Sequence, residues 1–525
     1  MREAIEDVIE LKVIRTAYAK PREVFREILK INDFITFMPN VKKSQIIERK
    51  GLTVKTHWSV EIDGIPISWI EEEVVDPIRL TIRFRALEGD LEKFDGEWAF
   101  KPDPKGTRVE IGLRAGLGIP LIERLVSKTL KEKIEKNFVM MIESLNNKIV
   151  SERYRNFRAG KYKGIGGFAI IGHPYNLNNL IRYLKYLKPD VHVPSREFLL
   201  KVYELVPSYV MYDIRDFESS NGQNTHGLVI VSTFIPDMMK VDADLVFRKV
   251  VEACRVAESH HIGVAALGGF TSIVGENYSD QLRNQVHISL TTGNTFTVSL
   301  AIDGVLKACD LMGIDLHSAT LAVIGGTGDI GSACAKILRD EVKELIITGR
   351  DPEKVRQTVD MLQTDSSCQV SGTVDNLEAV KKANVIIAAA SVTSSIIDIN
   401  TFKPGTVICD LAYPKNISHV PTSRKDILIF SGGLSQIPHD IELGFEIGLP
   451  SHRTLYGCFA EAILLDFEKR YESFSYGRGN ITPEKVREIR RIGEKHGFTL
   501  APFFWGDRLI SEKEIEEIRK SKQMV

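Results

Sequence analysis

Hydrophobic and polar positions alternate along most of the first 150 residues. A period of two is typical of strands with one buried face, and turn signals such as Asp63-Gly64 and Asp95-Gly96 separate the runs. A helix over residues 21–39 follows the first run, and a long helix over residues 120–150 follows the last. The apolar face of the long helix consists of Ile122, Leu125, Val126, Ile134, Phe138, Ile142 and Leu145. This order of elements predicts an α+β domain over residues 1–150.

A different pattern, apolar runs without alternation, marks residues 316–440. Such runs alternate with helical segments there, which predicts a doubly wound parallel sheet that binds a nucleotide. Shorter strands and helices over residues 165–315 predict an α/β substrate domain, and the basic, aperiodic residues 151–164 predict a linker. We expect residues 441–525 to form a C-terminal helical segment. The expected fold class is therefore α/β, preceded by an α+β domain.

Length, charge and cysteine usage narrow the class of protein. The chain has 525 residues and a formal net charge of −1, so it is long enough for several domains and gives no reason to expect nucleic acid as a partner. The acidic start, MREAIEDVIE, lacks the apolar core of a signal peptide, and no apolar run is long enough for a transmembrane helix. Six widely spaced cysteines favour free thiols in a reducing cytoplasm, with peripheral membrane contact left open. No residues have the spacing of metal ligands, so we expect no catalytic metal.

The clearest cofactor motif is Gly326-Thr327-Gly328-Asp329-Ile330-Gly331, which follows a predicted strand and opens a predicted helix. Glycines at these positions allow a tight turn and close approach of backbone N–H groups to a pyrophosphate. The next strand ends at Arg350, where NAD sites usually carry an acidic residue, so we expect NADPH, although Asp351 follows directly. Two later strand ends are expected to face the nicotinamide and contain Ala390, Ser391 and Tyr413.

Residues 455–468, LYGCFAEAILLDFE, predict a helix with an apolar face and a cysteine at its start. Cys458 follows Gly457, and the unpaired N–H groups and dipole of a helix N-terminus stabilise a thiolate. Glu461, one turn further on, opposes this effect if its carboxylate is ionised and close. By position alone, Cys458 fits a packing residue and a nucleophile equally well.

Long and unusual strings spread over the two C-terminal domains point to one family. They are IGHPYNL, HGLVIVSTFIPDMM, AALGGFTSIVGEN, TTGNTFTV, GGTGDIGSA, YPKNI, GCFAEAILLDFE and FSYGRGNIT. Through these strings, residues 168–498 resemble the cyanobacterial long-chain acyl-ACP reductases, which make fatty aldehydes from acyl thioesters with NADPH. In that family the cysteine of the CFAEA string accepts the acyl group, which implies this role for Cys458. The family's cofactor loop corresponds to Gly326–Gly331 and its adenosine-side arginine to Arg350.

The resemblance implies a covalent mechanism. The Cys458 thiolate attacks the carbonyl of a long-chain acyl-ACP or acyl-CoA, the carrier thiol leaves, and the acyl-enzyme is reduced with NADPH to an aldehyde. Both oxyanions need hydrogen-bond donors, for which we select the backbone near Cys458 and the hydroxyl of Ser232 or Thr271. A partner enzyme that consumes the aldehyde is a further expectation.

The first 150 residues are an addition to what we expect of the small cyanobacterial members. Their order of elements resembles the helix-grip fold of the START-like, polyketide-cyclase and coenzyme-Q-binding superfamily, in which a long helix closes a curved sheet over an apolar cavity. The resemblance implies a lipid, an acyl chain or a polyketide as ligand, with a filled core as the alternative. The added domain leaves the natural acyl donor open.

Two other functions remain as alternatives. A reductase of the shikimate-dehydrogenase or glutamyl-tRNA-reductase type would share the doubly wound domain, although the near-zero net charge argues against a tRNA substrate. A module that senses NADPH or lipid without turnover would keep its biological activity in Cys458→Ser.

Overall fold

The computed structural model describes residues 9–118, 120–364, 366–392, 395–417, 424–444 and 447–522, without the side chains of residues 120–127 and 522. The chain divides into two compact units, Met1–Lys163 and Gly164–Val525. Each unit has its own hydrophobic core. Among the described residues, no helix is both long enough and apolar enough to cross a membrane.

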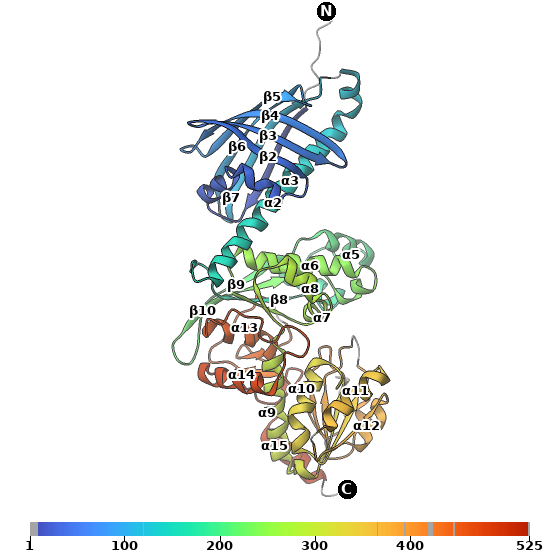
Figure 1. Cartoon of the computed structure of the whole chain (residues 1–525). Helices are drawn as coiled ribbons and strands as arrows, with labels where there is room; N and C mark the ends of the chain where they lie inside the picture. Colours follow the sequence, from blue (N-terminus) through green and yellow to red (C-terminus); the bar gives the residue numbers. More distant parts are fainter. Residues whose placement is uncertain are drawn as a thin grey trace, which may run out of the picture. The chain divides into compact units, whose positions relative to one another are not determined.

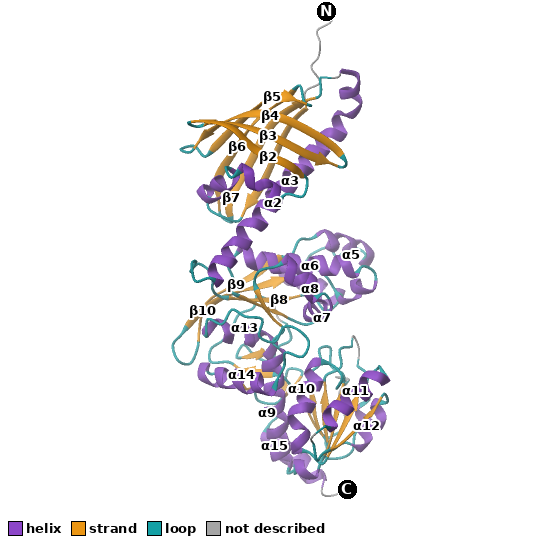
Figure 2. Ribbon diagram, in the orientation of Figure 1, coloured by secondary structure: helices purple, strands orange, loops and turns teal. Residues whose placement is uncertain are grey.

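The N-terminal unit is an antiparallel sheet that curves around a long helix (Figures 1 and 2). Its seven strands follow the order β1-β7-β6-β5-β4-β3-β2. They are β1 (Ile9–Ala17), β2 (Val41–Lys50), β3 (Thr53–Ile62), β4 (Ile65–Asp76), β5 (Thr81–Gly89), β6 (Lys93–Asp103) and β7 (Gly106–Gly116). The helix α3 (Pro120–Arg158) buries Ile134, Ile142 and Leu145 in the core of this sheet, and Phe138 packs against them. This arrangement confirms the expected helix-grip fold; Ile122, Leu125 and Val126 lie outside the described side chains.

The helix predicted over residues 21–39 is instead three short pieces. These are α1 (Pro21–Ile28), the 3-10 helix η1 (Ile31–Asp33) and α2 (Phe34–Phe37). The break lies at Lys30, whose backbone leaves the helical region at φ −82° and ψ 57°. The turn buries Ile31 and Phe34 in the core, a gain that a straight helix would not allow.

The predicted linker also differs from the structure, because α3 continues to Arg158 and residues 151–158 are helical. Tyr154 is buried, and the Arg153 guanidinium donates a hydrogen bond to the carbonyl oxygen of Tyr18 at 3.1 Å. The Arg153 hydrogen bond attaches this part of α3 to the residue that follows β1. A basic segment without apolar periodicity was therefore insufficient to identify a linker.

The larger unit contains a sheet of six parallel strands in the order β15-β14-β13-β16-β17-β18. They are β13 (Thr320–Ile324), β14 (Glu344–Thr348), β15 (Gln369–Thr373), β16 (Val385–Ala388), β17 (Val407–Asp410) and β18 (Leu428–Ser431). The helices α10 (Asp329–Leu338) and α11 (Pro352–Gln363) pack into one core of this sheet, and α12 (Asn376–Lys382) packs into another. This strand order is that of doubly wound dinucleotide folds, and confirms the predicted class. The order reverses between β13 and β16, where such folds bind their ligands.

A second sheet of the larger unit has the order β12-β11-β8-β10-β9. Its strands are β8 (Phe168–Gly172), β9 (Tyr209–Glu218), β10 (Asn224–Val231), β11 (Val264–Leu267) and β12 (Ser289–Thr291), with β9 antiparallel to its neighbour. The helix α13 (Gly457–Phe467) shares a core with β8, β10 and β11, and α6 (Ala243–Ser259) also contacts the sheet. The remaining helices of this part are α4 (Leu177–Leu187), α5 (Arg196–Leu205), α7 (Phe270–Asn277) and α8 (Ser279–Gln285).

The two sheets are joined by contacts between elements that lie on different sides of the predicted domain boundaries. The helix α9 (Asn294–Met312) packs against both α13 and the parallel sheet. Residues 441–525 are more than a helical segment: besides α13, α14 (Pro483–His496) and α15 (Glu512–Lys522) they contain β20 (Thr454–Tyr456), β21 (Thr499–Leu500), β22 (Phe504–Trp505) and β23 (Arg508–Leu509). The strands β20 and β21 pair with β19 (Leu434–Gln436), which lies before that boundary. Strands of two or three residues are too short for their period to be recognised in a sequence.

Candidate active site

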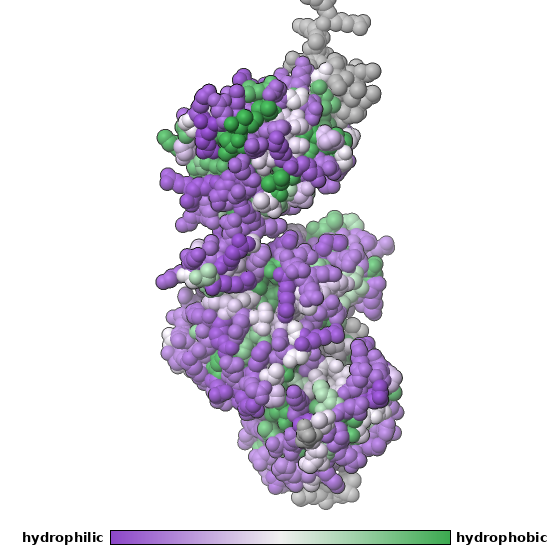
Figure 3. Space-filling model, viewed as in Figure 1, coloured by the Kyte–Doolittle hydropathy of each residue, from purple (hydrophilic) through white to green (hydrophobic). Residues whose placement is uncertain are grey.

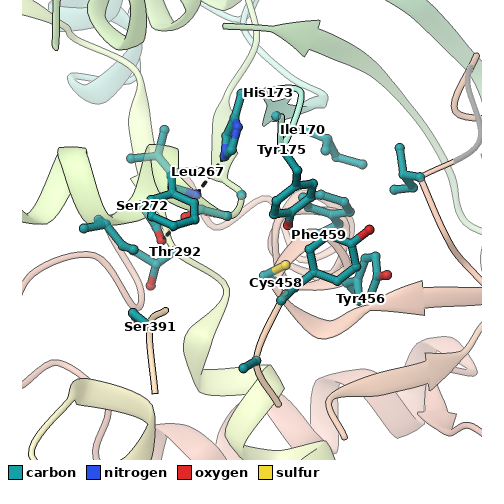
Figure 4. A pocket seen from close by; sticks show the side chains of 18 of the residues that line it. Ile170, His173, Tyr175, Leu267, Ser272, Thr292, Ser391, Tyr456, Cys458 and Phe459 are labelled. Atoms are coloured by element: carbon teal, nitrogen blue, oxygen red, sulfur yellow. Dashed lines mark hydrogen bonds between the residues drawn. The ribbon is translucent and has the colours of Figure 1, made fainter. Parts of the chain in front are cut away.

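A cavity of about 440 Å³ lies in the larger unit, where the strand ends of both sheets meet the start of α13 (Figure 4). Loops after β8 and β11 contribute His173 and Gly268, and the loops after β13, β16 and β17 contribute Gly328, Ser391 and Tyr413. Because the carboxyl ends of parallel strands are the usual ligand sites in α/β sheets, this cavity is the candidate active site.

Cys458 is the second residue of α13 and lines this cavity beside Tyr456 and Phe459 (Figure 4). All six cysteines lie in the described residues; the other five are buried, and Cys458 alone is partly exposed. The first turn of α13 packs directly on α9: a Cβ atom on Gly457 would lie 2.9 Å from the backbone of Thr297. Close packing of two backbones thus holds the thiol at the cavity wall.

The charge state of Cys458 differs from the expectation for a helix N-terminus. Burial, together with a smaller effect of the Glu461 charge, raises the pKa of its thiol to about 12. The backbone N–H groups of Cys458 and Phe459 act in the opposite direction but do not outweigh burial. The resting site therefore holds a neutral thiol.

Glu461 has a structural explanation. Its carboxylate is fully buried and accepts hydrogen bonds from the backbone N–H of Phe296, at 2.9 Å, and from the Thr291 hydroxyl. Burial raises the pKa of Glu461. The side chain thus connects α13 to the first turn of α9 and to the end of β12, one turn behind Cys458.

His173 lies at the end of β8 with both ring nitrogens in use. Its Nε2 accepts a hydrogen bond from the backbone N–H of Phe270 at 2.9 Å, and its Nδ1 donates to the carbonyl oxygen of Pro174 at 3.0 Å. The ring stacks on Phe234, and burial lowers its pKa to about 4. A neutral imidazole with both nitrogens already hydrogen-bonded is unsuited to remove a proton from Cys458. Through its bond to Phe270, the ring holds the loop after β11 in place.

Lys415 is a site residue that the sequence analysis did not select. It belongs to the YPKNI string after β17, lines the cavity, and donates a hydrogen bond to the carbonyl oxygen of Asp410 at 2.7 Å. Burial lowers the pKa of Lys415, and the Asp410 carboxylate opposes that shift. An ammonium has three N–H donors, so two remain for a ligand in the cavity.

The cofactor motif forms the loop between β13 and α10. Gly325, the residue before the motif, has φ +75°, and a Cβ atom there would lie 2.7 Å from the Cα of Ala390. Gly328, Asp329 and Ile330 line the cavity, whereas Gly326, Thr327 and Gly331 support the packing of the loop from behind. A backbone that admits no side chain beside a helix N-terminus is the cradle that a pyrophosphate requires.

Across the switch point, two hydrogen bonds hold the end of β16 to the loop after β17. Asn416 accepts a hydrogen bond from the N–H of Ala390 and donates one to its carbonyl oxygen, both at 2.9 Å. Ala390 and Ser391, two of the positions selected from the sequence, line the cavity. The centroid of the Tyr413 ring lies 4.0 Å from that of the Tyr175 ring.

Two arginines belong to this end of the parallel sheet: Arg350 follows β14, and Arg478 lines the cavity. Arg350 is exposed after β14, while the carboxylate of Asp351 accepts hydrogen bonds from the N–H groups of Glu353, at 3.0 Å, and Lys354. Asp351 therefore caps α11 instead of competing with Arg350. Arg478, from the FSYGRGNIT string, lines the cavity. Burial raises the pKa of Asp329, and the Arg478 charge partly offsets that rise.

Ser232 and Thr271 do not take the places predicted for oxyanion donors. Neither is among the described residues that line the cavity. The Thr271 hydroxyl donates to the carbonyl oxygen of Gly268 at 2.7 Å, and the Ser232 side chain is fully buried at the end of β10. Their strings lie near the site, but pattern alone does not show which side of a strand end faces a ligand.

The N-terminal unit holds a smaller cavity of about 100 Å³ with aromatic walls. Glu71 and Glu73 are the charged residues among its described lining. The Trp69 indole donates to Glu71 at 2.8 Å, and the Thr56 hydroxyl donates to Glu73 at 3.2 Å. Burial raises the pKa of Glu73 to about 7 and that of Glu71 well above its ordinary value, to which the Glu73 charge contributes.

Comparisons with known proteins match both units. The family model for polyketide cyclase / dehydrase and lipid transport matches residues 18–139, and that for shikimate / quinate 5-dehydrogenase matches residues 307–431.

A long-chain acyl-[acyl-carrier-protein] reductase of Synechococcus elongatus is 34% identical over 346 residues, which cover 63% of this chain and 98% of that protein. The aminotransferase PigE of a Serratia species is 27% identical over 66% of this chain, which spans only 41% of PigE. Among solved structures, the Zhui aromatase/cyclase of a Streptomyces species is 17% identical, covers 30% of this chain and 99% of its own, and has a TM-score of 0.27.

Proposed function

The chain belongs to the long-chain acyl-[acyl-carrier-protein] reductase family and is an oxidoreductase, and from this premise we propose that it reduces a long-chain acyl thioester to a fatty aldehyde with NADPH. The acyl group is transferred from its carrier, ACP or CoA, to Cys458. The observation that carries the proposal is the Cys458 thiol in a cavity that the cofactor loop also lines.

Acyl transfer exchanges one thioester for another. The Cys458 sulfur bonds to the acyl carbon, the bond from that carbon to the carrier sulfur breaks, and the thiol proton ends on the carrier thiol. The neutral resting thiol suits a site that is reactive only when substrate has filled the cavity.

We assign the acyl oxygen to the Lys415 ammonium. Its two remaining N–H donors and its positive charge stabilise the negative charge on that oxygen in acyl transfer and in reduction. When the reduced acyl group leaves as the aldehyde, Cys458 departs as a thiolate; the Lys415 ammonium would protonate this sulfur and would then regain a proton from solvent.

The residues around the switch point fit a dinucleotide. The loop at Gly325–Gly328 and the first turn of α10 would hold the pyrophosphate, with Arg478 adding positive charge, and Arg350 would hold the 2′-phosphate. Bound there, NADPH supplies the hydride that reduces the acyl carbon. The capping role of Asp351 supports this cofactor preference because it turns the nearest carboxylate toward α11.

The decisive experiment uses acyl-ACP or acyl-CoA without NADPH. Intact mass should show one added acyl group on the wild type and on the control Cys368→Ala, and none on Cys458→Ser. Addition of NADPH should release the aldehyde. If the wild type forms no adduct, the covalent mechanism is excluded.

A matched pair of arginine variants tests the cofactor. Arg350→Ala should raise the KM for NADPH by about tenfold or more while leaving that for NADH unchanged, since only NADPH has the 2′-phosphate. Arg356→Ala, an exposed position in α11 that pairs with Glu353, should leave both constants unchanged. Equal effects of Arg350→Ala on the two cofactors would contradict this assignment.

We also propose that the N-terminal cavity holds an apolar group, such as one end of an acyl chain or aldehyde. Its volume, about 100 Å³, is close to that of cavities that bind a single small ring, so a whole long chain does not fit. Three of the four tryptophans, Trp58, Trp69 and Trp98, line it. Octanal should change the tryptophan fluorescence of the full chain, and a cavity-filling Ile82→Phe should abolish the change; no response of the wild type to octanal or octanol would refute the proposal.

A further inference from the structure

The helices α4 and α5 form one wall of the active-site cavity. Leu180 and Tyr183 of α4 and Tyr203 of α5 line it from within. Leu199 and Tyr203 of α5 are buried. The wall therefore has an inner face that packs against the protein. Its outer face forms the surface of the protein on this side of the cavity.

The outer face of α5 carries an apolar stripe. Phe198, Val202 and Leu205 are 60%, 40% and 82% exposed. Their spacing of i, i+4 and i+7 places them on one side of the helix, away from the buried residues. A helix that is apolar on both sides needs a second partner besides the protein core.

The end of α4 adds two more exposed apolar residues to this part of the chain, Tyr186 and Leu187, which are 65% and 61% exposed. In the described part of the larger unit, thirteen large hydrophobic residues are exposed, and five of them lie between residues 186 and 205. Figure 3 shows hydrophobic residues at the surface where α5 lies in Figure 1. We call these five residues the apolar ridge.

The charges around the apolar ridge have the sign that an anionic surface attracts. Residues 177–206 contain five basic residues and three acidic ones, a net charge of +2 in a chain whose total is −1. All five basic residues are exposed: Arg182, Lys185, Lys188, Arg196 and Lys201. Arg182 also lines the active-site cavity. Apolar residues flanked by Lys and Arg are characteristic of helices that lie in a membrane interface.

We propose that the apolar ridge docks the protein on the surface of an anionic lipid bilayer. Side chains that project from a short helix enter a deformable lipid phase without a complementary groove, and the flanking cations meet the phosphates. The ridge is the outer side of the cavity wall, so the lipid phase borders the site of an apolar substrate and product. This second part rests on the proposed function, whereas the docking itself does not.

Vesicle flotation of the full chain, without substrate or cofactor, tests the docking. The wild type should float with vesicles of phosphatidylcholine and phosphatidylglycerol, and less with phosphatidylcholine alone. Phe198→Ser/Leu205→Ser should lower the partition coefficient by about tenfold or more. The control Leu509→Ser removes a side chain that is 54% exposed on β23 and should bind vesicles like the wild type.

Turnover of octanoyl-CoA and thermal unfolding should be the same in the double variant and the wild type, because both substituted side chains point away from the cavity. Absence of vesicle binding by the wild type would overturn the proposal, as would equal binding by the double variant. If the substitutions weakened binding of acyl-ACP but not of vesicles, the ridge would be a carrier-protein site and the proposal would also fail. Loss of acyl transfer with retained vesicle binding would refute only the proposed function.

Discussion

The Glu461 carboxylate accepts a hydrogen bond from the backbone N–H of Phe296 at 2.9 Å, and this contact joins the helix of Cys458 to the first turn of α9. Glu461→Ala should lower the free energy of unfolding by roughly 2–4 kcal/mol, because a buried N–H group and the Thr291 hydroxyl lose their acceptor. Glu461→Gln keeps an acceptor and should cost only about 1 kcal/mol. Urea unfolding measures both, and similar losses in the two variants would contradict the structural role.

The raised pKa of Cys458 predicts slow alkylation at neutral pH. With a thiol pKa of about 12, the thiolate fraction and hence the rate of reaction with iodoacetamide should rise about tenfold per pH unit from pH 7 to pH 10. The rate is followed as mass added to the wild type and absent from Cys458→Ser. A rate that levels off near neutral pH would show that the helix N-terminus outweighs burial after all.

The folds of the N-terminal domain and of the parallel-sheet domain were predictable because each hydrophobic pattern recurs several times along the chain. Six alternating segments predict the antiparallel sheet, and apolar runs such as TLAVI and VIIA predict the parallel strands. The helix over residues 21–39 was wrong because tertiary burial of Ile31 and Phe34 outweighs local periodicity. The short strands β19 to β23 have no period that could be recognised.

The candidate site was only partly predictable for a related reason. Cys458 and the glycine loop have sequence signals of their own, whereas the environment of Lys415 depends on where the chain returns after β17. A lone lysine after a strand is usually a surface residue. Ser232 and Thr271 were selected for their hydroxyls within the family strings, and only the folded backbone shows that neither is among the described residues that line the cavity.

The proposed role of Lys415 predicts a specific kinetic defect. Lys415→Met should lower acyl transfer to Cys458 and aldehyde release by about 10²–10³-fold, the usual effect of losing an oxyanion donor. NADPH binding, measured by its fluorescence, should not change. Unaltered acyl transfer in Lys415→Met would remove this residue from the mechanism.

The pH profile separates this role from a structural one. Since burial lowers the pKa of Lys415, its active ammonium form is lost as pH rises through that value, and activity should fall. Lys415→Arg, whose guanidinium stays charged, should retain part of the activity and lack that alkaline decline. A structural lysine would give the same profile shape in both proteins.

The buried carboxyl pair Glu71 and Glu73 predicts that the N-terminal unit becomes less stable as pH rises. Most acidic groups act in the opposite direction, because their pKa is lowered by folding. The folded pKa of Glu73 is about 7, above the ordinary value of 4.5, so the proton is bound more tightly in the folded state. The contribution to stability is complete below about pH 4.5 and is lost as pH rises through about 7, with Glu71 acting in the same direction. Between about pH 5.5 and about pH 8.5 the free energy of unfolding of the unit should fall by a few kcal/mol.

Urea unfolding of the full chain, followed by tryptophan fluorescence, measures this loss, since three of the four tryptophans lie in this unit. Glu71→Gln/Glu73→Gln, which cannot ionise, should flatten the profile, whereas Glu97→Gln, an exposed position on β6, should not. A wild-type unit that is more stable at the higher pH would show that the pair is ionised in the folded state.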